Sequence, residues 1–191
     1  MNIDLYQTAT GLLEKIQKKE ISALELLEIH LKKIEGDNQE INAVVVANVG
    51  QATERAKAAD EALAQGESWG SLHGLPMTVK DSFEVEGIAS TGGSPKWKGH
   101  VPKRSADAIQ RLVNAGAIVF GKTNVPLLSG DFQTFNDVYG TTNNPWDVTK
   151  TPGGSSGGAA AALAAGMTPL EIGSDIAVSY THLTLPTNRE V

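Results

Sequence analysis

The chain has 191 residues, of which 40% are hydrophobic and 20% are charged, and its net charge is −6. This length suits about one domain of an ordinary globular protein. The acidic balance disfavours nucleic acid and anionic membranes as partners. The absence of cysteine excludes disulfides, thiolate zinc sites and a cysteine nucleophile, and because it fits a reducing compartment we expect a cytoplasmic location.

The N-terminus predicts neither a secretory signal nor a membrane span. Its first 20 residues carry acidic or polar side chains every few positions and contain no apolar signal-peptide core. No segment reaches about 18 consecutive apolar residues, the length that a membrane-spanning helix requires.

The first 40 residues predict two helices. A short amphipathic helix is expected over 5–18, from the spacing of its leucine and isoleucine residues. Ser22 is followed three residues later by Glu25, which is a capping box, and the helix that it begins is expected to end near Gly36. His30 lies within this second helix, and we expect it to be solvated or half-buried.

The next segments predict a strand, a helix and a second strand. The short β-branched segment 41–49 indicates a buried strand, and the Ala-rich segment 51–66 indicates a helix. Segment 72–83 contains a turn and then an extended apolar run that ends at Lys80 and Asp81.

The middle of the chain continues this alternation. A helix is expected over 105–116 with Ser105 as its N-cap, followed by a strand over 117–124. Alternating strands and helices predict an α/β fold with a partly parallel sheet. Segment 126–152 is irregular, and a loop of this length inside a domain is usually functional.

The Gly/Ser run TPGGSSGGAAAALAAG, at 151–166, is predicted to open a helix. It passes directly into the helix-forming stretch 159–165 and ends at Gly166, which disfavours a flexible linker. A Walker-type phosphate loop is disfavoured because no lysine follows the glycines. A dinucleotide-binding loop needs a strand directly before it, and Pro152 is a poor end for a strand.

A third interpretation of the run is a serine-hydrolase turn. Gly153-x-Ser155-x-Gly157 matches the G-x-S-x-G pattern, and Asp175 and His182 follow in the order of an α/β-hydrolase triad. This interpretation also requires a strand before the serine, and its histidine lies in the C-terminal segment 178–191, which differs in kind from the rest of the chain.

The remaining interpretation is a serine site served by lysine. A serine hydroxyl is a weak nucleophile until a base accepts its proton, and a neutral lysine can be that base. Lys80 ends an apolar run, and burial can lower a lysine pKa by up to roughly 3–5 units. On spacing alone, however, an ordinary strand-end lysine paired with Asp81 or another acid is favoured.

Four segments together resemble the amidase signature family. They are GLPMTVKD (74–81), GKTNVP (121–126), YGTTNNPWD (139–147) and the long segment 151–177. The resemblance extends from Met1 to Ala177. It implies the N-terminal part of an α/β fold in which a mixed sheet is flanked by helices, and it implies an enzyme that hydrolyses or transfers amide nitrogen.

The family uses a Ser–Ser–Lys triad, and the resemblance assigns its members here. Lys80 matches the base, and Ser155 matches the bridging serine, whose preceding peptide bond is cis in the family. Aligned from Asp175, Ser179 falls at the nucleophile position. The resemblance also implies six residues that line the oxyanion hole or the substrate pocket. They are Ile176, Ala177, Val178, Ser156, Asp131 and Gln133.

The implied reaction converts a small-molecule carboxamide to a carboxylate and ammonia or an amine. Neutral Lys80 takes a proton from Ser155, which takes one from Ser179, and Ser179 attacks the carbonyl. No metal or cofactor is implied. The loop LLSGDFQTFNDVYGTTNNPWD resembles stand-alone amidases more than the corresponding subunit of a glutamyl-tRNA(Gln)-type amidotransferase, which is the alternative. An alternative of another class is a nucleotide-binding module that uses the Gly-rich helix start.

The family pattern stops after Ala177. Gly-Ser-Ile-Arg is expected next, but Val178 stands in place of the glycine and Thr181 in place of the arginine. Back-translated, VSYTHLTLPT resembles a sequencing adapter read in frame. We therefore expect 1–177 to be the N-terminal portion of an amidase domain and 178–191 to be a non-native tail, with a divergent natural C-terminus as the alternative. We expect such a chain to have little or no activity.

Overall fold

The computed structural model describes residues 3–175, and its elements alternate as the sequence predicts. The helices are α1 (Ala9–Gln17), α2 (Ala23–Ile41), α3 (Val49–Ala64), α4 (Asp107–Asn114) and α5 (Gly157–Ala164). The strands are β1 (Val44–Ala47), β2 (Pro76–Lys80), β3 (Ile118–Thr123), β4 (Phe135–Asn136), β5 (Gly140–Thr141) and β6 (Glu171–Ile172). Short 3₁₀ turns lie at Pro95–Trp97 and Leu127–Ser129.

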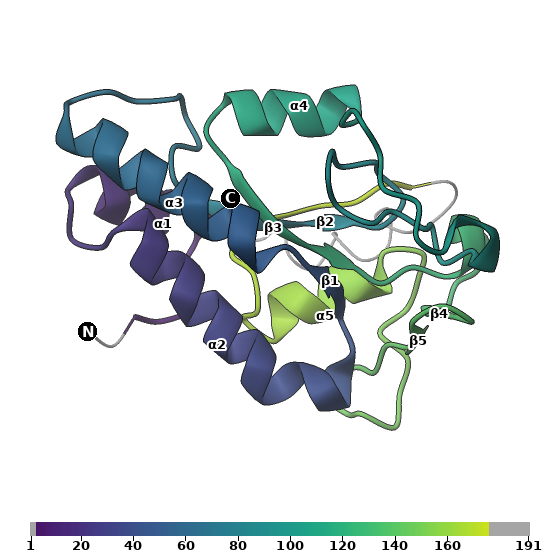
Figure 1. Cartoon of the computed structure of the whole chain (residues 1–191). Helices are drawn as coiled ribbons and strands as arrows, with labels where there is room; N and C mark the ends of the chain where they lie inside the picture. The colour runs from purple at the N-terminus through teal and green to yellow at the C-terminus, as the bar shows by residue number, and fades with distance from the viewer. Residues whose placement is uncertain (1–2, 176–191) are drawn as a thin grey trace.

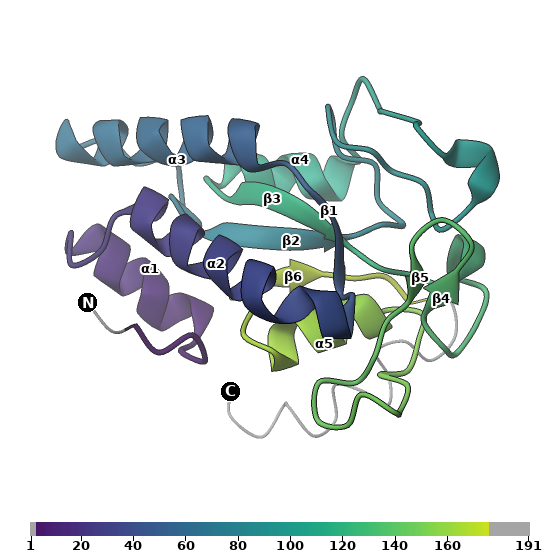
Figure 2. The ribbon, with the colours of Figure 1, turned by 60° about the horizontal axis from the view of Figure 1, so that its bottom comes forward.

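Four of the strands form a mixed sheet in the order β1-β3-β2-β6. β2 pairs in parallel with both β3 and β6, whereas β1 is antiparallel to β3. The predicted α/β fold with a mixed sheet is thus confirmed. Figure 2 shows β6 along the edge of the sheet, next to β2.

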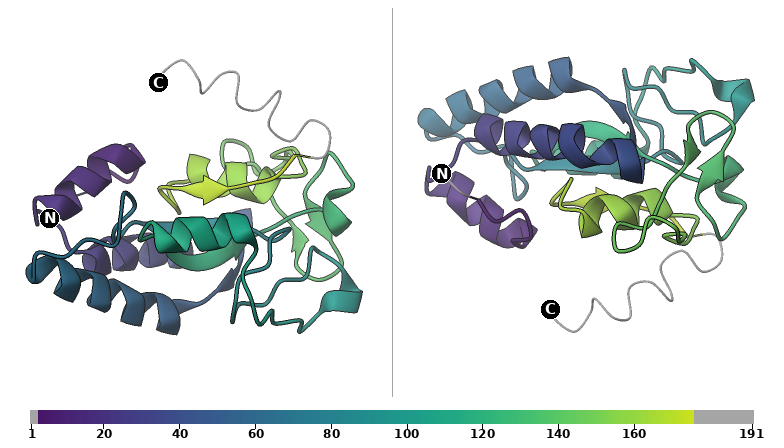
Figure 3. Two further views of the ribbon diagram at one scale, coloured as in Figure 1. Left: turned by 90° about the horizontal axis from the view of Figure 1, so that it is seen from above. Right: turned by 90° about the horizontal axis from the view of Figure 1, so that it is seen from below.

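Helices cover both faces of this sheet. Figure 1 shows α4 on one side and α5 on the other. Met77 and Val79 of β2 pack with Ile109 of α4 in one apolar cluster. In both views of Figure 3, α2 and α3 lie side by side, and alanines on α3 pack against Phe120 of β3. Among residues 3–175, no helix is both long and apolar enough to cross a membrane.

The first two helices differ from their predicted bounds. The first begins at Ala9 rather than residue 5, because Thr8 is its N-cap and accepts a hydrogen bond from the Gly11 amide. The capping box that begins α2 is confirmed, with both of its hydrogen bonds present. The prediction that α2 ends near Gly36 is wrong. The helix continues to Ile41, whose side chain is buried against α5, and left-handed Asn42 ends it.

The strand predicted over 41–49 is shorter and less buried than expected. Because α2 runs to Ile41, β1 begins only at Val44, and it forms one edge of the sheet. Val44 is buried, but Ala47 at the other end is exposed. An edge strand has a neighbour on one side only, which explains the partial exposure.

Ser105 does not cap α4 as predicted. The helix begins at Asp107, after Ala106, and no side chain caps it. The Ser105 hydroxyl instead accepts a hydrogen bond from the Glu86 amide at 3.0 Å. The serine therefore joins the segment after β2 to the start of α4.

His30 is buried, which corrects the expectation of a solvated or half-buried residue. Its exposed fraction is 0%. One ring nitrogen, Nδ1, lies 3.2 Å from the Gly166 carbonyl oxygen, and Nε2 has no hydrogen-bond partner among the described residues. Burial lowers the pKa of His30 to about 4, although the bond to Gly166 acts in the opposite direction.

Two asparagines hold the long segment 126–152 against the end of β3. The Asn136 side chain donates to Asn124 and to the Val125 carbonyl, both at 2.7 Å. Asn124 in turn donates to Thr142 and to the Gly140 carbonyl. The segment also carries the small β4–β5 ladder. The asparagine bonds hold it beside the start of α5 (Figure 2).

The Gly/Ser run opens a helix, as predicted, and Gly158 allows that helix to approach the sheet closely. A Cβ placed on Gly158 would lie 2.4 Å from both the amide nitrogen and the carbonyl oxygen of Asn124. These are backbone atoms directly after β3, so they cannot move aside as a flexible side chain could. The absence of a side chain therefore sets how near α5 lies to the sheet.

We predict that Gly158→Ala destabilises the chain. The added methyl group overlaps the Asn124 backbone, and overpacking of this kind costs about 1–3 kcal/mol of the free energy of unfolding. Gly36→Ala is the matched control, because Gly36 is also helical but has no atom within 4 Å of its added Cβ. That control is expected to raise stability by roughly 0.5–1 kcal/mol. Urea denaturation distinguishes the two, and equal effects would contradict the close approach of α5.

We also predict a fall in stability between pH 7 and pH 5 that depends on His30. The unfolded histidine has a pKa near 6.5 and the folded one about 4, so the unfolded state binds more protons as the pH falls between these values. The expected loss is about 2 kcal/mol at pH 5. His30→Leu should flatten the dependence measured by urea denaturation, and His100→Gln, a half-exposed control, should not. An unchanged slope in His30→Leu would refute this assignment.

Candidate active site

Lys80 and Ser155, which lie 75 residues apart in the chain, are joined by a hydrogen bond. Lys80 ends β2 and is completely buried, and Ser155 is buried immediately before α5. The Lys80 Nζ atom donates to the Ser155 Oγ atom at 2.7 Å. It also donates to the Ser174 carbonyl oxygen at 2.8 Å, in the segment after β6.

The peptide bond between Gly154 and Ser155 is cis, as the family resemblance implies. Ser156, the next residue, is also buried, and its Oγ atom donates to the Ser174 carbonyl oxygen at 3.2 Å. Lys80 and Ser156 therefore share one carbonyl acceptor. The start of α5 and the end of β6 meet at the carboxyl end of β2.

Burial makes Lys80 less basic than an exposed lysine. It lowers the pKa of Lys80 to about 8, although the charges of Asp175 and Glu171 act in the opposite direction. A substantial fraction of the amine is then neutral near pH 8, which is the form that can accept a proton. The chemistry that the geometry allows is proton transfer between Lys80 and the Ser155 hydroxyl.

Asp81 does not pair with Lys80, so the predicted pairing of a strand-end lysine with Asp81 is wrong. Consecutive residues of a strand point to opposite faces of the sheet. Asp81 instead forms a buried ion pair with Lys122, at 3.0 Å. The Lys122 Nζ atom also donates to the Phe83 carbonyl and the Ser90 hydroxyl, and burial lowers its pKa.

A charged residue of the site that was not predicted from the sequence is Glu171, a half-buried residue of the edge strand β6. Its carboxylate accepts hydrogen bonds from the hydroxyl groups of Thr78 and Thr123, both of which are buried. Burial raises the pKa of Glu171 to about 8, against these two hydrogen bonds and the charges of Lys122 and Lys80. Residue spacing could not reveal this contact, because Glu171 lies more than 90 positions from Thr78.

Two residues that the resemblance places at the substrate lie in a loop beside the serine segment. A Cβ on Gly154 would lie 2.8 Å from the Gln133 amide nitrogen and 2.9 Å from the Asp131 carbonyl oxygen. The Asp131 side chain is exposed and accepts a hydrogen bond from the Gln133 amide. The loop backbone is therefore adjacent to Ser155, while contact of either side chain with a substrate stays a prediction.

Several predicted site residues lie outside the described part of the chain. They are Ser179, Ile176, Ala177, Val178 and His182. Asp175 is the last described residue, and it is exposed. The third member of the predicted triad therefore stays a prediction.

The structure does not provide the strand that two other interpretations of the Gly/Ser run require. No strand occurs in 148–156, directly before the run. Both a nucleophile elbow and a dinucleotide-binding loop place their glycines at the end of a strand. Within 3–175, no group of three or more histidine, aspartate or glutamate residues is arranged to hold a metal ion.

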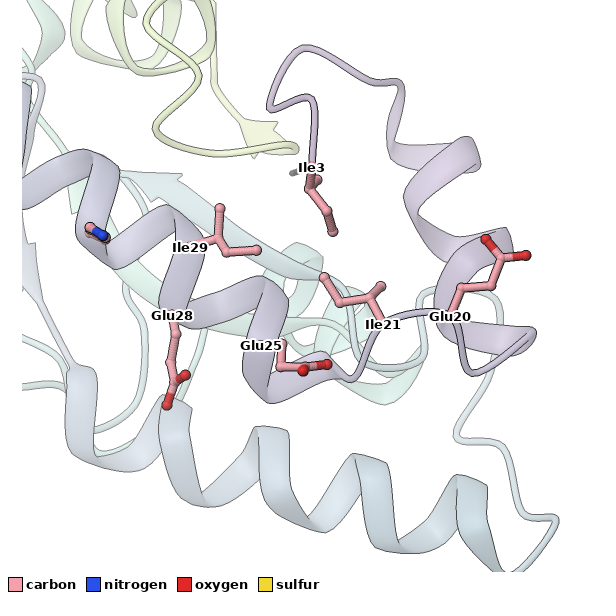
Figure 4. Close-up of a pocket in the computed structure, with 7 residues that line it drawn as sticks. Ile3, Glu20, Ile21, Glu25, Glu28 and Ile29 are labelled. Atoms are coloured by element: carbon pink, nitrogen blue, oxygen red, sulfur yellow. The ribbon is translucent and has the colours of Figure 1, made fainter. Parts of the chain in front are cut away.

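A surface hollow near the N-terminus has a different character from the Lys80–Ser155 site. Figure 4 shows the side chains of Ile3, Ile21 and Ile29 converging on it, with Glu20 and Glu25 around them. The described residues that line the hollow include no serine or histidine. It therefore contains no serine–lysine pair like that of Lys80 and Ser155.

Comparison with known proteins identifies the class. The Amidase family profile matches residues 25–180, which is most of the chain. The chain belongs to the amidase family. This agrees with the resemblance carried by the lysine and Gly/Ser segments, and with the mixed sheet flanked by helices.

Curated relatives are named as a subunit of glutamyl-tRNA(Gln) amidotransferase. One from Streptomyces coelicolor is 41% identical over 168 residues, which are 88% of this chain and 34% of that protein. Another from Caldanaerobacter subterraneus is 38% identical over 174 residues, 91% of this chain and 36% of that protein. The chain thus spans about one third of the length of these relatives.

Solved structures with the same fold include several hydrolases. A 6-aminohexanoate cyclic dimer hydrolase aligns with a TM-score of 0.81 and 32% identity, covering 89% of this chain and 34% of that one. A bacterial aryl acylamidase of the amidase signature family aligns at 0.82 and 32%, covering 87% and 35%. A structure from work on the origins of an s-triazine catabolic enzyme aligns at 0.85 and 37%, covering 88% and 37%.

We predict that Asp81→Ala destabilises the chain strongly. The substitution leaves the Lys122 ammonium buried without its carboxylate, and breaking a buried pair costs about 3–5 kcal/mol. Asp107→Ala is the matched control, since Asp107 pairs with Arg104 on the surface, and such pairs contribute about 1 kcal/mol or less. Thermal and urea unfolding at pH 7 measure both. A loss in Asp81→Ala as small as in the control would contradict the role of this pair.

Proposed function

We propose that this chain carries two members of a Ser–Ser–Lys triad of an amide hydrolase. The observation that carries the proposal is the 2.7 Å hydrogen bond between the buried Lys80 Nζ atom and the Ser155 Oγ atom. The lowered pKa of Lys80 supports it, because a base must be neutral before it can accept a proton. Membership of the amidase family agrees with this chemistry.

In the proposed reaction Ser155 relays a proton rather than attacking the substrate. Neutral Lys80 accepts the Ser155 proton while Ser155 accepts a proton from the nucleophilic serine of the longer protein, whose position in the family pattern Ser179 occupies in this chain. That serine forms an acyl-enzyme with the amide carbonyl carbon, and the nitrogen leaves as ammonia or an amine after protonation. Water then attacks the acyl-enzyme, and the carboxylate product is released. Backbone amides near Ile176, Ala177 and Val178 are proposed to stabilise the oxyanion.

We propose a small-molecule amide as the substrate, with a stand-alone amidase as the first candidate. The loop that runs from Leu127 to Asp147 favours it, and the aryl acylamidase and the cyclic dimer hydrolase share the fold. The second candidate is a subunit of a glutamyl-tRNA(Gln) amidotransferase, because curated relatives are named for that enzyme. The two differ in substrate: a stand-alone amidase should release ammonia from simple aliphatic or aryl amides, and the subunit should favour glutamine.

We propose that residues 1–177 form the N-terminal portion of a larger amidase domain and that 178–191 are not native to it. The departure from the family pattern after Ala177 supports this division. Large apolar side chains are exposed on 127–146, which suits a surface that further chain would cover. They are Leu127, Leu128, Phe132, Phe135 and Trp146. The proposed activity is that of the longer protein.

We predict that Lys80→Ala lowers amide turnover about 10²–10⁴-fold, which is the usual contribution of a general base. The assay measures ammonia release from an aliphatic amide, an aryl amide and glutamine. It uses a protein in which residues 1–177 are joined to the remainder of an amidase-family domain. Lys57→Ala, on the exposed face of α3, is the matched lysine control and should retain turnover.

The 191-residue chain is assayed in parallel and should show little or no turnover. Turnover by the longer protein that survives both Lys80→Ala and Ser155→Ala would refute the proposed triad. Strong turnover by the 191-residue chain, abolished by Lys80→Ala, would support the triad but contradict the proposed need for further chain.

A further inference from the structure

Glu171 is an acidic residue of the sheet whose carboxylate accepts hydrogen bonds from hydroxyl groups of two other strands, β2 and β3. Thr78 is the ladder partner of Glu171 between β2 and β6. Thr123 is the ladder partner of Lys80 between β2 and β3. Thr78 and Lys80 are two positions apart on β2, so their side chains point to the same face. Glu171, both threonines and Lys80 therefore share one face of the sheet.

The threonine hydroxyl groups fix where the carboxylate of Glu171 lies. One carboxylate oxygen accepts from Thr123 at 3.1 Å, and the other accepts from Thr78. Both threonines have an exposed fraction of 0%, so neither hydroxyl has ready access to water as an alternative partner. A carboxylate that accepts two buried hydroxyl donors is held in a defined orientation.

In the described part of the chain, two neutral oxygen atoms accept hydrogen bonds from Lys80. They are the Ser155 hydroxyl and the Ser174 carbonyl oxygen. The neighbouring Asp81 is engaged by Lys122 on the opposite face. Within 3–175, the negative charges that raise the pKa of Lys80 are those of Asp175 and Glu171, and of these two Glu171 lies within the sheet.

We propose that Glu171 is a positioning residue of the Lys80–Ser155 site, and that its carboxylate, held by Thr78 and Thr123, sets the fraction of Lys80 that is available as a neutral base. An ionised Glu171 stabilises the Lys80 ammonium, and a protonated Glu171 favours the free amine. This inference rests on the proposed function for its catalytic meaning. The electrostatic coupling itself does not depend on catalysis.

The other charged groups around this carboxylate come from every strand beside it. Lys80 ends β2, Lys122 lies in β3 with its charge balanced by Asp81, and Asp175 follows β6. Lys122 and Lys80 both lower the pKa of Glu171, which burial raises to about 8. Lys80 has a pKa of about 8 as well, so the two groups exchange protons with solvent over the same pH range.

The test is an NMR titration of Lys80 in the 191-residue chain labelled with carbon-13 and nitrogen-15. The Lys80 side-chain carbon shift is followed between pH 6 and pH 11 in the unmodified chain and in Glu171→Gln. Removal of a nearby opposite charge should lower the Lys80 pKa by about 1 unit or more. Glu171→Asp keeps the charge, so its Lys80 pKa should lie between those of the unmodified chain and Glu171→Gln. Glu61→Gln, an exposed control on α3, should leave the Lys80 pKa unchanged.

Two further variants keep the test decisive where Glu171→Gln fails to fold. Thr78→Val and Thr123→Val each remove a donor that favours the ionised carboxylate, so each should lower the Lys80 pKa in the same direction by a smaller amount. A Lys80 pKa that is unchanged in every folded variant overturns the proposal. Because the titration reads the coupling directly, its failure is separate from the failure of Lys80→Ala to reduce amide turnover.

Discussion

A lysine amine buried in the interior and bonded to a serine hydroxyl is the interaction around which this structure is built. Burying an unpaired ammonium is costly, so a protein keeps such a lysine only where hydrogen bonds support it or where it becomes neutral. Lys80 shows both, with two oxygen partners and a lowered pKa. The bond also requires that β2 and the start of α5 lie next to each other, although they are far apart in the chain.

Two structural features bring these elements together. The parallel pairing of β2 with β3 and β6 gathers the carboxyl ends of three strands at one edge, where Lys80, Asn124 and Ser174 follow one another in space. The absence of a side chain at Gly158 then lets α5 approach the backbone of Asn124. The serine segment is thereby brought against the end of β2, and the Asn124–Asn136 network orders the loop beside it.

Alternation of side chains along β2 and β3 places two lysines, Lys80 of β2 and Lys122 of β3, on opposite faces of the sheet. Lys122 and Asp81 form a closed ion pair on one face, where their charges satisfy each other. Lys80 lies on the opposite face and donates hydrogen bonds to neutral acceptors. The charge of Glu171, on the neighbouring strand, raises the pKa of Lys80. A one-residue change in the register of β2 would exchange the two faces and place Lys80 beside the wrong neighbours.

The sequence alone determined the alternation of strands and helices, the capping box of α2, the helix after the Gly/Ser run and the candidate pair Lys80 and Ser155. These follow from local periodicity, local capping and a distinctive family motif. The tertiary structure decided what depends on distant contacts. It buried His30 against the Gly166 carbonyl, extended α2 past Gly36 because Ile41 packs on α5, and used Ser105 to bind the Glu86 amide. It also paired Asp81 with Lys122 rather than Lys80, and joined Glu171 to Thr78 and Thr123. No local pattern encodes these pairings, because strand order and register bring together residues that lie tens of positions apart.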